Sequence, residues 1–169
     1  MKQKRLWVSL AVVLALILAA FFLFPQDDKA MVRYTEYIQE KRHEPLRTYH
    51  QDPVVGLFLT EDGNHAGIAM VTEDHIGEVT NLIHQSDPTF LSVKGAEETY
   101  IGILLPSALV EDNSIHSVSI KDTESGELPI DEEQDIFFSF VFLEADVSIP
   151  IQLQFKNKDL EVVYEFEVE

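Results

Sequence analysis

The stretch Ile136-Phe137-Phe138-Ser139-Phe140-Val141-Phe142-Leu143 decides the fold. Its apolar side chains stand at both odd and even positions, which is typical of a strand buried on both faces and not of a strand with one wet face. We therefore expect residues 136–143 to form a central strand at the heart of the core.

Two segments after this strand alternate between apolar and polar residues. Residues 148–156 and 160–169 are separated by Asn157-Lys158-Asp159, a typical turn sequence. This pattern predicts a C-terminal antiparallel hairpin with one wet face. The residues expected to face inward are Ile149, Ile151, Leu153 and Phe155 in the first strand, and Val162, Tyr164, Phe166 and Val168 in the second.

Further strand-like segments precede residue 136. Residues 54–60 and 65–72 flank Glu61-Asp62-Gly63-Asn64, where Asp-Gly is a strong hairpin signal. Residues 89–93, 99–105 and 115–121 also resemble strands. Short strands at this spacing predict a mainly β fold, an antiparallel β-sandwich of immunoglobulin-like general shape. The chain has no cysteine and its one tryptophan is Trp7, so the sandwich is an architecture and not a family assignment.

One short helix is expected inside the β domain. Residues 74–85 place Ile76, Val79, Leu82 and Ile83 on one side of a helix. Thr72 or Asp74 would cap it, and Ser86-Asp87-Pro88 would end it, although Gly77 disfavours a helix.

The N-terminal segment predicts a membrane anchor. Residues 6–24 form an apolar run interrupted only by Ser9, long enough to span roughly 28 Å as a helix. Lys2, Lys4 and Arg5 precede it, which predicts a cytoplasmic N-terminus. A cleaved signal peptide is the alternative, but the bulky residues 21–25 do not resemble a cleavage site.

The region after the anchor predicts a helical stalk. Met31, Tyr34, Tyr37 and Ile38 recur at helical spacing, and Pro45 ends the pattern. The apolar face of this helix could rest on headgroups, pair with another helix or pack back on the domain, and we favour the packing. The predicted organisation is a cytoplasmic tail at 1–5, a transmembrane anchor at 6–24, a juxtamembrane stalk at 25–49 and an extracytoplasmic β domain at 50–169.

The charge is strongly uneven along the chain. All 30 acidic residues but only nine of the 12 basic ones follow residue 24, which leaves that part with a net charge near −21. Such a surface repels nucleic acid and excludes it as a partner, whereas it favours cationic partners. Without cysteine the domain has no disulfides and depends on core burial alone.

Two groups of residues are candidates for metal binding. His75 and Glu78 lie three apart on the expected short helix, with Glu73, Asp74 and His84 nearby, a spacing that can place His and Glu beside one ion. The alternative is a solvated helix face.

The second group is the acidic run Asp131, Glu132, Glu133 and Asp135. An acidic loop supplies the oxygen ligands that Ca²⁺ prefers, but this run lacks the alternating acids and the glycine of a calcium loop. A solvated acidic loop is the alternative. No hydrolase, zinc-protease, phosphate-loop or dinucleotide motif is present, and cofactors other than Ca²⁺ are not indicated.

Three classes of function remain. The leading one is a single-pass, membrane-anchored extracytoplasmic β domain that binds an envelope protein or cell-surface component, with residues 6–24 in the plasma membrane. The second is a pilin-like or secretion-filament subunit, which shares this layout. The Gly before the helix and the Glu five positions into it that mark such subunits are missing here. The third is an enzyme that uses carboxylates or a metal, although no catalytic residue stands out.

Overall fold

The computed structural model describes residues 28–49, 53–95, 98–121, 126–133, 135–143 and 150–168, without the side chains of 141–143. The predicted tail at 1–5 and anchor at 6–24 lie outside the described residues. Within the described ranges, neither helix has the length and apolar character needed to cross a membrane.

Two helices and twelve strands make up the described part of the chain. The helices are α2 (Lys29–Lys41) and α3 (Ser107–Asn113). The strands are β1 (Glu44–Tyr49), β2 (Val54–Leu59), β3 (His65–Val71), β4 (Ile76–Leu82), β5 (Thr89–Lys94), β6 (Thr99–Leu105), β7 (Ser117–Ile120), β8 (Leu128–Pro129), β9 (Asp131–Glu133), β10 (Ile136–Leu143), β11 (Ile151–Lys156) and β12 (Val162–Val168).

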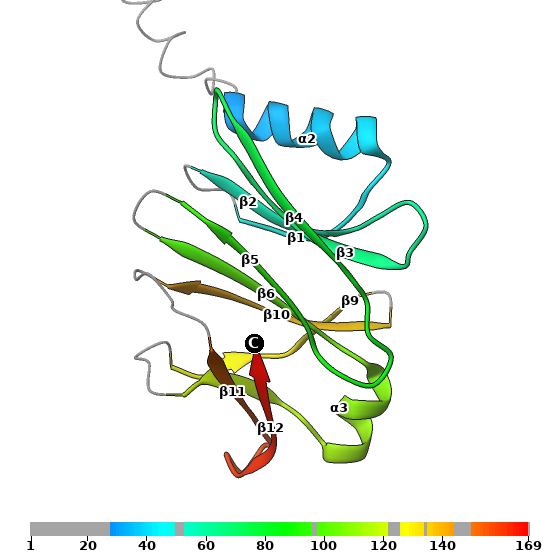
Figure 1. The fold of residues 1–169 in the computed structure, drawn as a ribbon, viewed down its shortest axis with the longest axis vertical. Coiled ribbons are helices and arrows are strands. Elements are labelled where there is room, and N and C mark those ends of the chain that lie inside the picture. The colour runs from blue at the N-terminus through cyan, green and yellow to red at the C-terminus, as the bar shows by residue number, and fades with distance from the viewer. Residues whose placement is uncertain are drawn as a thin grey trace, which may run out of the picture.

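The strands form three four-stranded antiparallel sheets. Sheet A has the order β1-β2-β3-β4, sheet B the order β5-β6-β10-β9, and sheet C the order β12-β11-β7-β8. Figure 1 shows them as successive layers, with α2 on the outer face of sheet A and sheet C at the opposite end of the long axis. The predicted mainly β, antiparallel class is confirmed, and the layers number three where we expected two.

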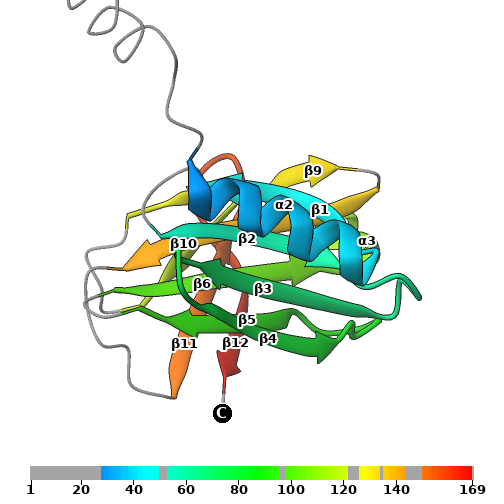
Figure 2. The same cartoon turned by 90° about the horizontal axis from the view of Figure 1, so that it is seen from above.

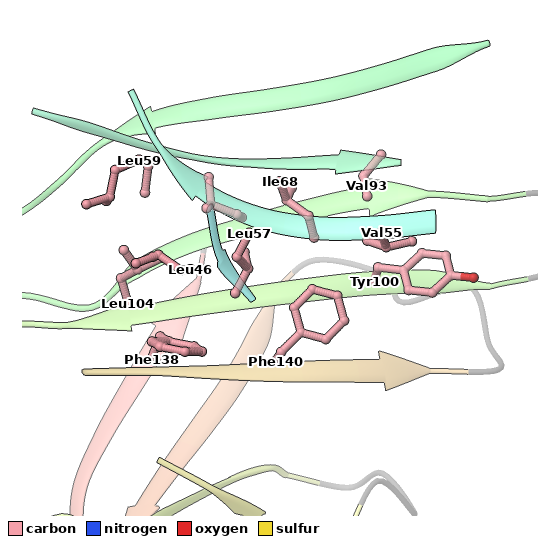
Figure 3. Packing of buried hydrophobic residues seen from close by; sticks show 12 residues of the cluster. Leu46, Val55, Leu57, Leu59, Ile68, Val93, Tyr100, Leu104, Phe138 and Phe140 are labelled. Atoms are coloured by element: carbon pink, nitrogen blue, oxygen red, sulfur yellow. The ribbon is translucent and has the colours of Figure 1, made fainter. Parts of the chain in front are cut away.

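Sheet B is the middle layer, and both of its faces are buried. Toward sheet A it presents Leu104 and Phe138, which pack in one cluster with Leu57 and Ile68 (Figure 3). Leu91 of β5 belongs to the same cluster. Its opposite face packs against sheet C through a second cluster that includes Ile101, Ile103, Val118, Leu153 and Phe155.

Strand β10 occupies residues 136–143 and lies between β6 and β9, so the strand prediction from the opening stretch is confirmed. Phe138 packs toward sheet A and Phe137 toward sheet C, as expected of a strand with two apolar faces. Its neighbour β6 is buried at all seven positions and shares the central role.

The predicted hairpin at 54–72 is confirmed. β2 and β3 pair from Leu59 opposite Ala66 to Val54 opposite Val71. At the turn, Gly63 has a φ of 66° and its amide donates to the carbonyl of Thr60 over 2.8 Å. A residue with a Cβ is strained at such a positive φ, which explains the glycine.

The helix predicted in the stalk is present and packs back on the domain. Asp28 caps α2 by accepting from the amides of Ala30 and Met31. The buried face of α2 joins Val54 and Phe58 of sheet A in one cluster. Residues 44–49 of the predicted stalk form β1, an edge strand of sheet A, so the boundary expected at residue 50 falls inside one sheet.

The helix predicted at 74–85 is wrong, because this segment contains strand β4. Thr72 and His75 close a tight turn in which the Thr72 amide donates to the His75 carbonyl over 2.9 Å. β4 then pairs with β3 along its whole length. Four of the five residues between Ile76 and Leu82 are Gly, Val, Thr and Asn, which are poor helix formers. A short helix occurs instead at α3, which the sequence pattern did not indicate.

The C-terminal hairpin is confirmed, with one correction. Ile151, Leu153 and Phe155 are buried as predicted. A register shift between Phe155 and Lys156 places Lys156 opposite Val162 and Phe155 opposite Tyr164. Val162 is consequently 46% exposed, although it was expected to face inward.

Candidate functional site

His75 and Glu78 do not come together in the structure. His75 lies in the turn before β4, and its Nε2 atom is 3.7 Å from the point where a Cβ on Gly77 would stand. Glu78 follows Gly77 on the strand and points to the opposite face, where its carboxylate accepts a hydrogen bond from the Tyr37 hydroxyl. The predicted metal-binding arrangement required a helix, on which residues three apart share a face. In the observed strand, residues three apart point to opposite faces.

The residues around this pair are also dispersed. Glu73 forms an ion pair with Lys29 over 3.1 Å, and the amide of His84 donates to the Thr89 hydroxyl over 3.0 Å. Among the described residues, no group of three or more His, Asp or Glu side chains is arranged to hold a metal ion.

The acidic run lies along an edge strand. Asp131, Glu132 and Glu133 form β9, opposite Phe138, Phe137 and Ile136 of β10. Neighbouring side chains on a strand point to opposite faces, so these three carboxylates do not converge. Asp135 lies in the following turn with a φ of 63°. Two further acidic residues that precede this run in the sequence, Asp122 and Glu124, lie outside the described residues.

A depression of about 500 Å³ lies between the C-terminal end of α2 and the β2–β3 hairpin. Sequence reasoning missed it, because its residues come from three separate segments and form no motif. Its lining mixes both charges, two imidazoles and two hydroxyls: Lys41, His43, Thr60, Glu61, Asp62, His65 and Thr80.

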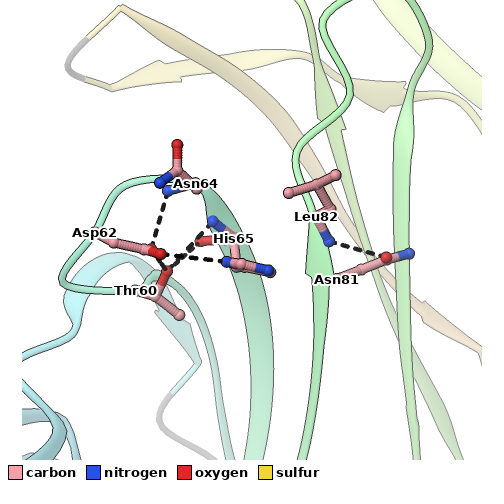
Figure 4. Close-up of polar contacts among 6 residues, drawn as sticks. All are labelled: Thr60, Asp62, Asn64, His65, Asn81 and Leu82. Carbon is pink, nitrogen blue, oxygen red and sulfur yellow. Dashed lines mark hydrogen bonds and ion pairs between the residues drawn. The ribbon is translucent and has the colours of Figure 1, made fainter.

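Asp62 is the centre of the polar contacts in this depression (Figure 4). Its carboxylate accepts from the Thr60 hydroxyl over 2.5 Å and from the Asn64 amide over 3.1 Å, and it lies 3.6 Å from Nδ1 of His65. The Thr60 hydroxyl, then the Asn64 amide, lower the pKa of Asp62 to about 2. Thr60 donates to the carboxylate and not to an imidazole, so Thr60, Asp62 and His65 lack the nucleophile–base contact of acyl-transfer sites. Their contacts stabilise the turn.

His43 forms an aromatic wall beside the same depression. Its ring stacks on Phe58 with centroids 4.3 Å apart, and it makes a T-shaped contact with Tyr37 with centroids 5.6 Å apart. Its Nδ1 atom is buried and has no hydrogen-bond partner among the described residues. Burial lowers the pKa of His43, an effect that Glu78 partly opposes. The imidazole is therefore a packing group in its neutral form.

A different kind of feature lies at the far end of the molecule, on the turn between β11 and β12. Leu160 is 56% exposed and Val162 is 46% exposed. We call these two residues the distal tip, because Figure 1 places this turn at the end of the long axis opposite α2. Leu160 was expected to begin a strand, and no sequence signal marked it as exposed.

The backbone of Leu160 is in the left-handed region, with a φ of 64°. Its amide donates to the Asn157 carbonyl over 3.0 Å, and the Asn157 amide donates to the Glu161 carbonyl over 3.0 Å. Glycine or asparagine usually occupies such a position, and a residue like leucine costs about 1–2 kcal/mol there. The turn thus holds a large apolar side chain at an unfavourable backbone angle, pointing into solvent.

The depression and the distal tip differ in whether their side chains have partners within the domain. In the depression, the carboxylates bind neighbours within the domain, Asp62 to Thr60 and Glu61 to Arg42 over 2.9 Å. No family model, curated protein or solved structure matches this chain. The candidate site is therefore chosen on geometry, and the distal tip is the feature whose apolar surface and strained backbone the domain itself does not use.

Proposed function

We propose that this protein is a membrane-tethered binding module. Residues 6–24 span the plasma membrane, residues 1–5 lie in the cytoplasm, and the β domain stands outside and binds an envelope protein or cell-surface component. The apolar run and the basic residues before it support the tether. In this proposal, sheets A and B form a sandwich of immunoglobulin-like general shape to which sheet C adds a third layer.

The observation that carries the binding role is the distal tip. Strained backbone conformations cluster at functional positions such as ligand-binding sites, so an observed outlier supports a hypothesis of function. Leu160 combines such strain with an exposed apolar side chain, and Val162 lies beside it in the same hairpin. Each side chain is already about half buried, so a partner that covers the remainder gains about 1 kcal/mol for each.

The charge of the domain defines the kind of partner. From residue 48 onward the chain has four lysines against 25 acidic residues. Beside the tip, Asp159 and Glu161 are exposed, and Glu165 and Glu167 continue along β12. A complementary partner therefore presents a small apolar pocket within a cationic surface.

Photo-crosslinking from the tip tests this role. The chain has no cysteine, so Leu160→Cys provides a single attachment point in the full-length protein, and the benzophenone attached there replaces the leucine side chain with another apolar group. In membranes of the producing cells, we expect one discrete adduct from position 160. Val79→Cys is the matched control, because Val79 is also exposed, at 41%, but lies on β4 of sheet A.

The result separates the three classes of function. An adduct from position 160 with one other protein supports the binding module. A ladder of adducts that contain only this chain indicates a filament subunit instead. Equal, unspecific adducts from positions 160 and 79, together with robust hydrolytic activity of the protein, would contradict the proposal and favour an enzyme.

A further inference from the structure

The chain enters the described domain at the N-terminal end of α2, which contacts the β3–β4 turn. Lys29 of α2 forms an ion pair with Glu73 over 3.1 Å, and Arg33 donates to the carbonyl of Glu73 over 2.5 Å. Two turns of α2 are therefore attached to the β3–β4 turn. Because Asp28 also caps the helix, the first residue of α2 has a fixed place relative to sheet A.

The distance from this point to the apolar run is short. Only residues 25–27 lie between Phe24 and Asp28. Four residue steps reach at most about 14 Å when fully extended. If residues 6–24 span a membrane, the N-terminal end of α2 must stay within this distance of the end of the span.

The shape of the domain determines which surface comes closest. Figure 1 shows α2 across one end of the long axis, and Figure 2, seen from above, shows it in front of the sheets. The face of α2 opposite its buried residues is exposed and carries a single charged group: it consists of Val32, Thr35, Glu36 and Gln39. Val32 points directly away from the core and is 46% exposed.

The charge distribution favours the same orientation. α2 contains three basic and two acidic residues. The chain from position 48 onward contains four lysines and 25 acidic residues. An anionic lipid surface repels such an acidic body and acts over about 8 Å at physiological salt. By net charge, α2 is therefore repelled less than the acidic segments that follow it.

We propose that the outward face of α2, formed by Val32, Thr35, Glu36 and Gln39, lies against the lipid headgroups. The sheets then stack away from the membrane, and the distal tip stands about 30 Å beyond α2, since adjacent layers are about 10 Å apart. This inference rests on the proposed tether and adds an orientation, which presents Leu160 to partners well above the headgroups.

Quenching by labelled lipids measures this orientation. Full-length Val32→Cys and Leu160→Cys variants carry the same fluorophore in vesicles of phosphatidylcholine with a minority of phosphatidylglycerol. Lipids with a spin label on the headgroup then quench probes that lie near the surface. We expect severalfold stronger quenching at position 32 than at position 160. Thr35→Cys gives a second probe on the same helix face.

Flotation of the vesicles distinguishes failure of the proposed orientation from failure of the proposed membrane tether. In one outcome the protein floats with the vesicles but is quenched equally at positions 32 and 160, or more at 160. This result would contradict the proposed orientation but not the proposed tether. Protein that does not float overturns both. A long Gly/Ser insertion between residues 27 and 28 is a further check, since it should reduce the quenching at position 32.

Discussion

The imidazole of His43 lies almost parallel to the ring of Phe58, with 4.3 Å between the centroids and 12° between the planes. His43 follows α2 and Phe58 belongs to β2, so this contact ties the C-terminal end of the helix to sheet A. With its Nδ1 atom buried and unpartnered within the described part of the chain, the ring contributes packing and not hydrogen bonding.

The folded protein should therefore lose stability in mild acid. Burial lowers the pKa of His43 below its ordinary value of 6.5, so the unfolded chain binds this proton more readily. The free energy of unfolding should fall as the pH drops below about 6.5. His43→Phe keeps the stack and should flatten this slope in urea titrations at several pH values. The control His75→Gln removes an exposed imidazole and should leave the slope in place.

Tyr37→Phe should destabilise the contact between α2 and β4. The Tyr37 hydroxyl donates to the Glu78 carboxylate, and burial, then Glu78, raise the pKa of this tyrosine. Loss of the donor should cost about 1 kcal/mol of unfolding free energy, measured by urea denaturation. Glu78→Gln retains an acceptor and should cost less. Equal losses for the two variants would show that the hydrogen bond is not the cause.

Asp62→Asn should lower the thermal midpoint at neutral pH and have no effect in strong acid. The pKa of Asp62 is lowered from 3.8 to about 2, so its contribution is present above pH 3.8 and is lost as the pH falls toward 2. Calorimetry across this range should show the two midpoints converging. Glu61→Gln changes a neighbouring exposed carboxylate and should shift the midpoint little.

Gly102→Ala should destabilise the packing between sheets A and B. A Cβ at this position of β6 would stand 2.2 Å from Cδ2 of Leu57, which lies in the closed core. Overpacking of this kind costs about 1–3 kcal/mol, measurable as a lower urea midpoint. Gly77→Ala in β4 is the matched control. Its Cβ would meet nothing closer than 3.7 Å, so an equal loss there would point to backbone effects.

Sequence patterns predicted the strands that have a local signal. The Asp62-Gly63 turn identified the first hairpin, and the two apolar faces of 136–143 identified a strand of the middle sheet. These features are predictable because turn chemistry and the period of side-chain burial depend on neighbouring residues.

Other elements depend on contacts that sequence spacing does not reveal. The spacing of Ile76, Val79 and Leu82 matched a helix, yet Val79 and Leu82 are 41% and 50% exposed on an edge strand. β1 is a strand because β2 pairs with it, and Pro45 is tolerated at that edge. The register shift that exposes Val162 is likewise a property of the paired hairpin.

The candidate site could not be predicted from the sequence either, because it also depends on contacts that sequence spacing does not reveal. Leucine at position 160 is unusual only once the turn gives it a φ of 64°. The metal candidates His75 and Glu78 were chosen for helical spacing, and the strand places them on opposite faces. The depression near His43 and Asp62 assembles residues that no motif connects.

The stability and the binding of one variant, Leu160→Gly, test the central claim most directly. Glycine relieves the backbone strain, so the unfolding free energy should rise by up to about 1 kcal/mol, reduced by the greater freedom of the unfolded chain. If the tip exists for a partner, crosslinking from a probe at the neighbouring position, Val162→Cys, should fall at least severalfold in the same variant. A domain that is at least as stable and has lost its partner is the predicted result. Undiminished crosslinking in the Leu160→Gly protein would contradict the account.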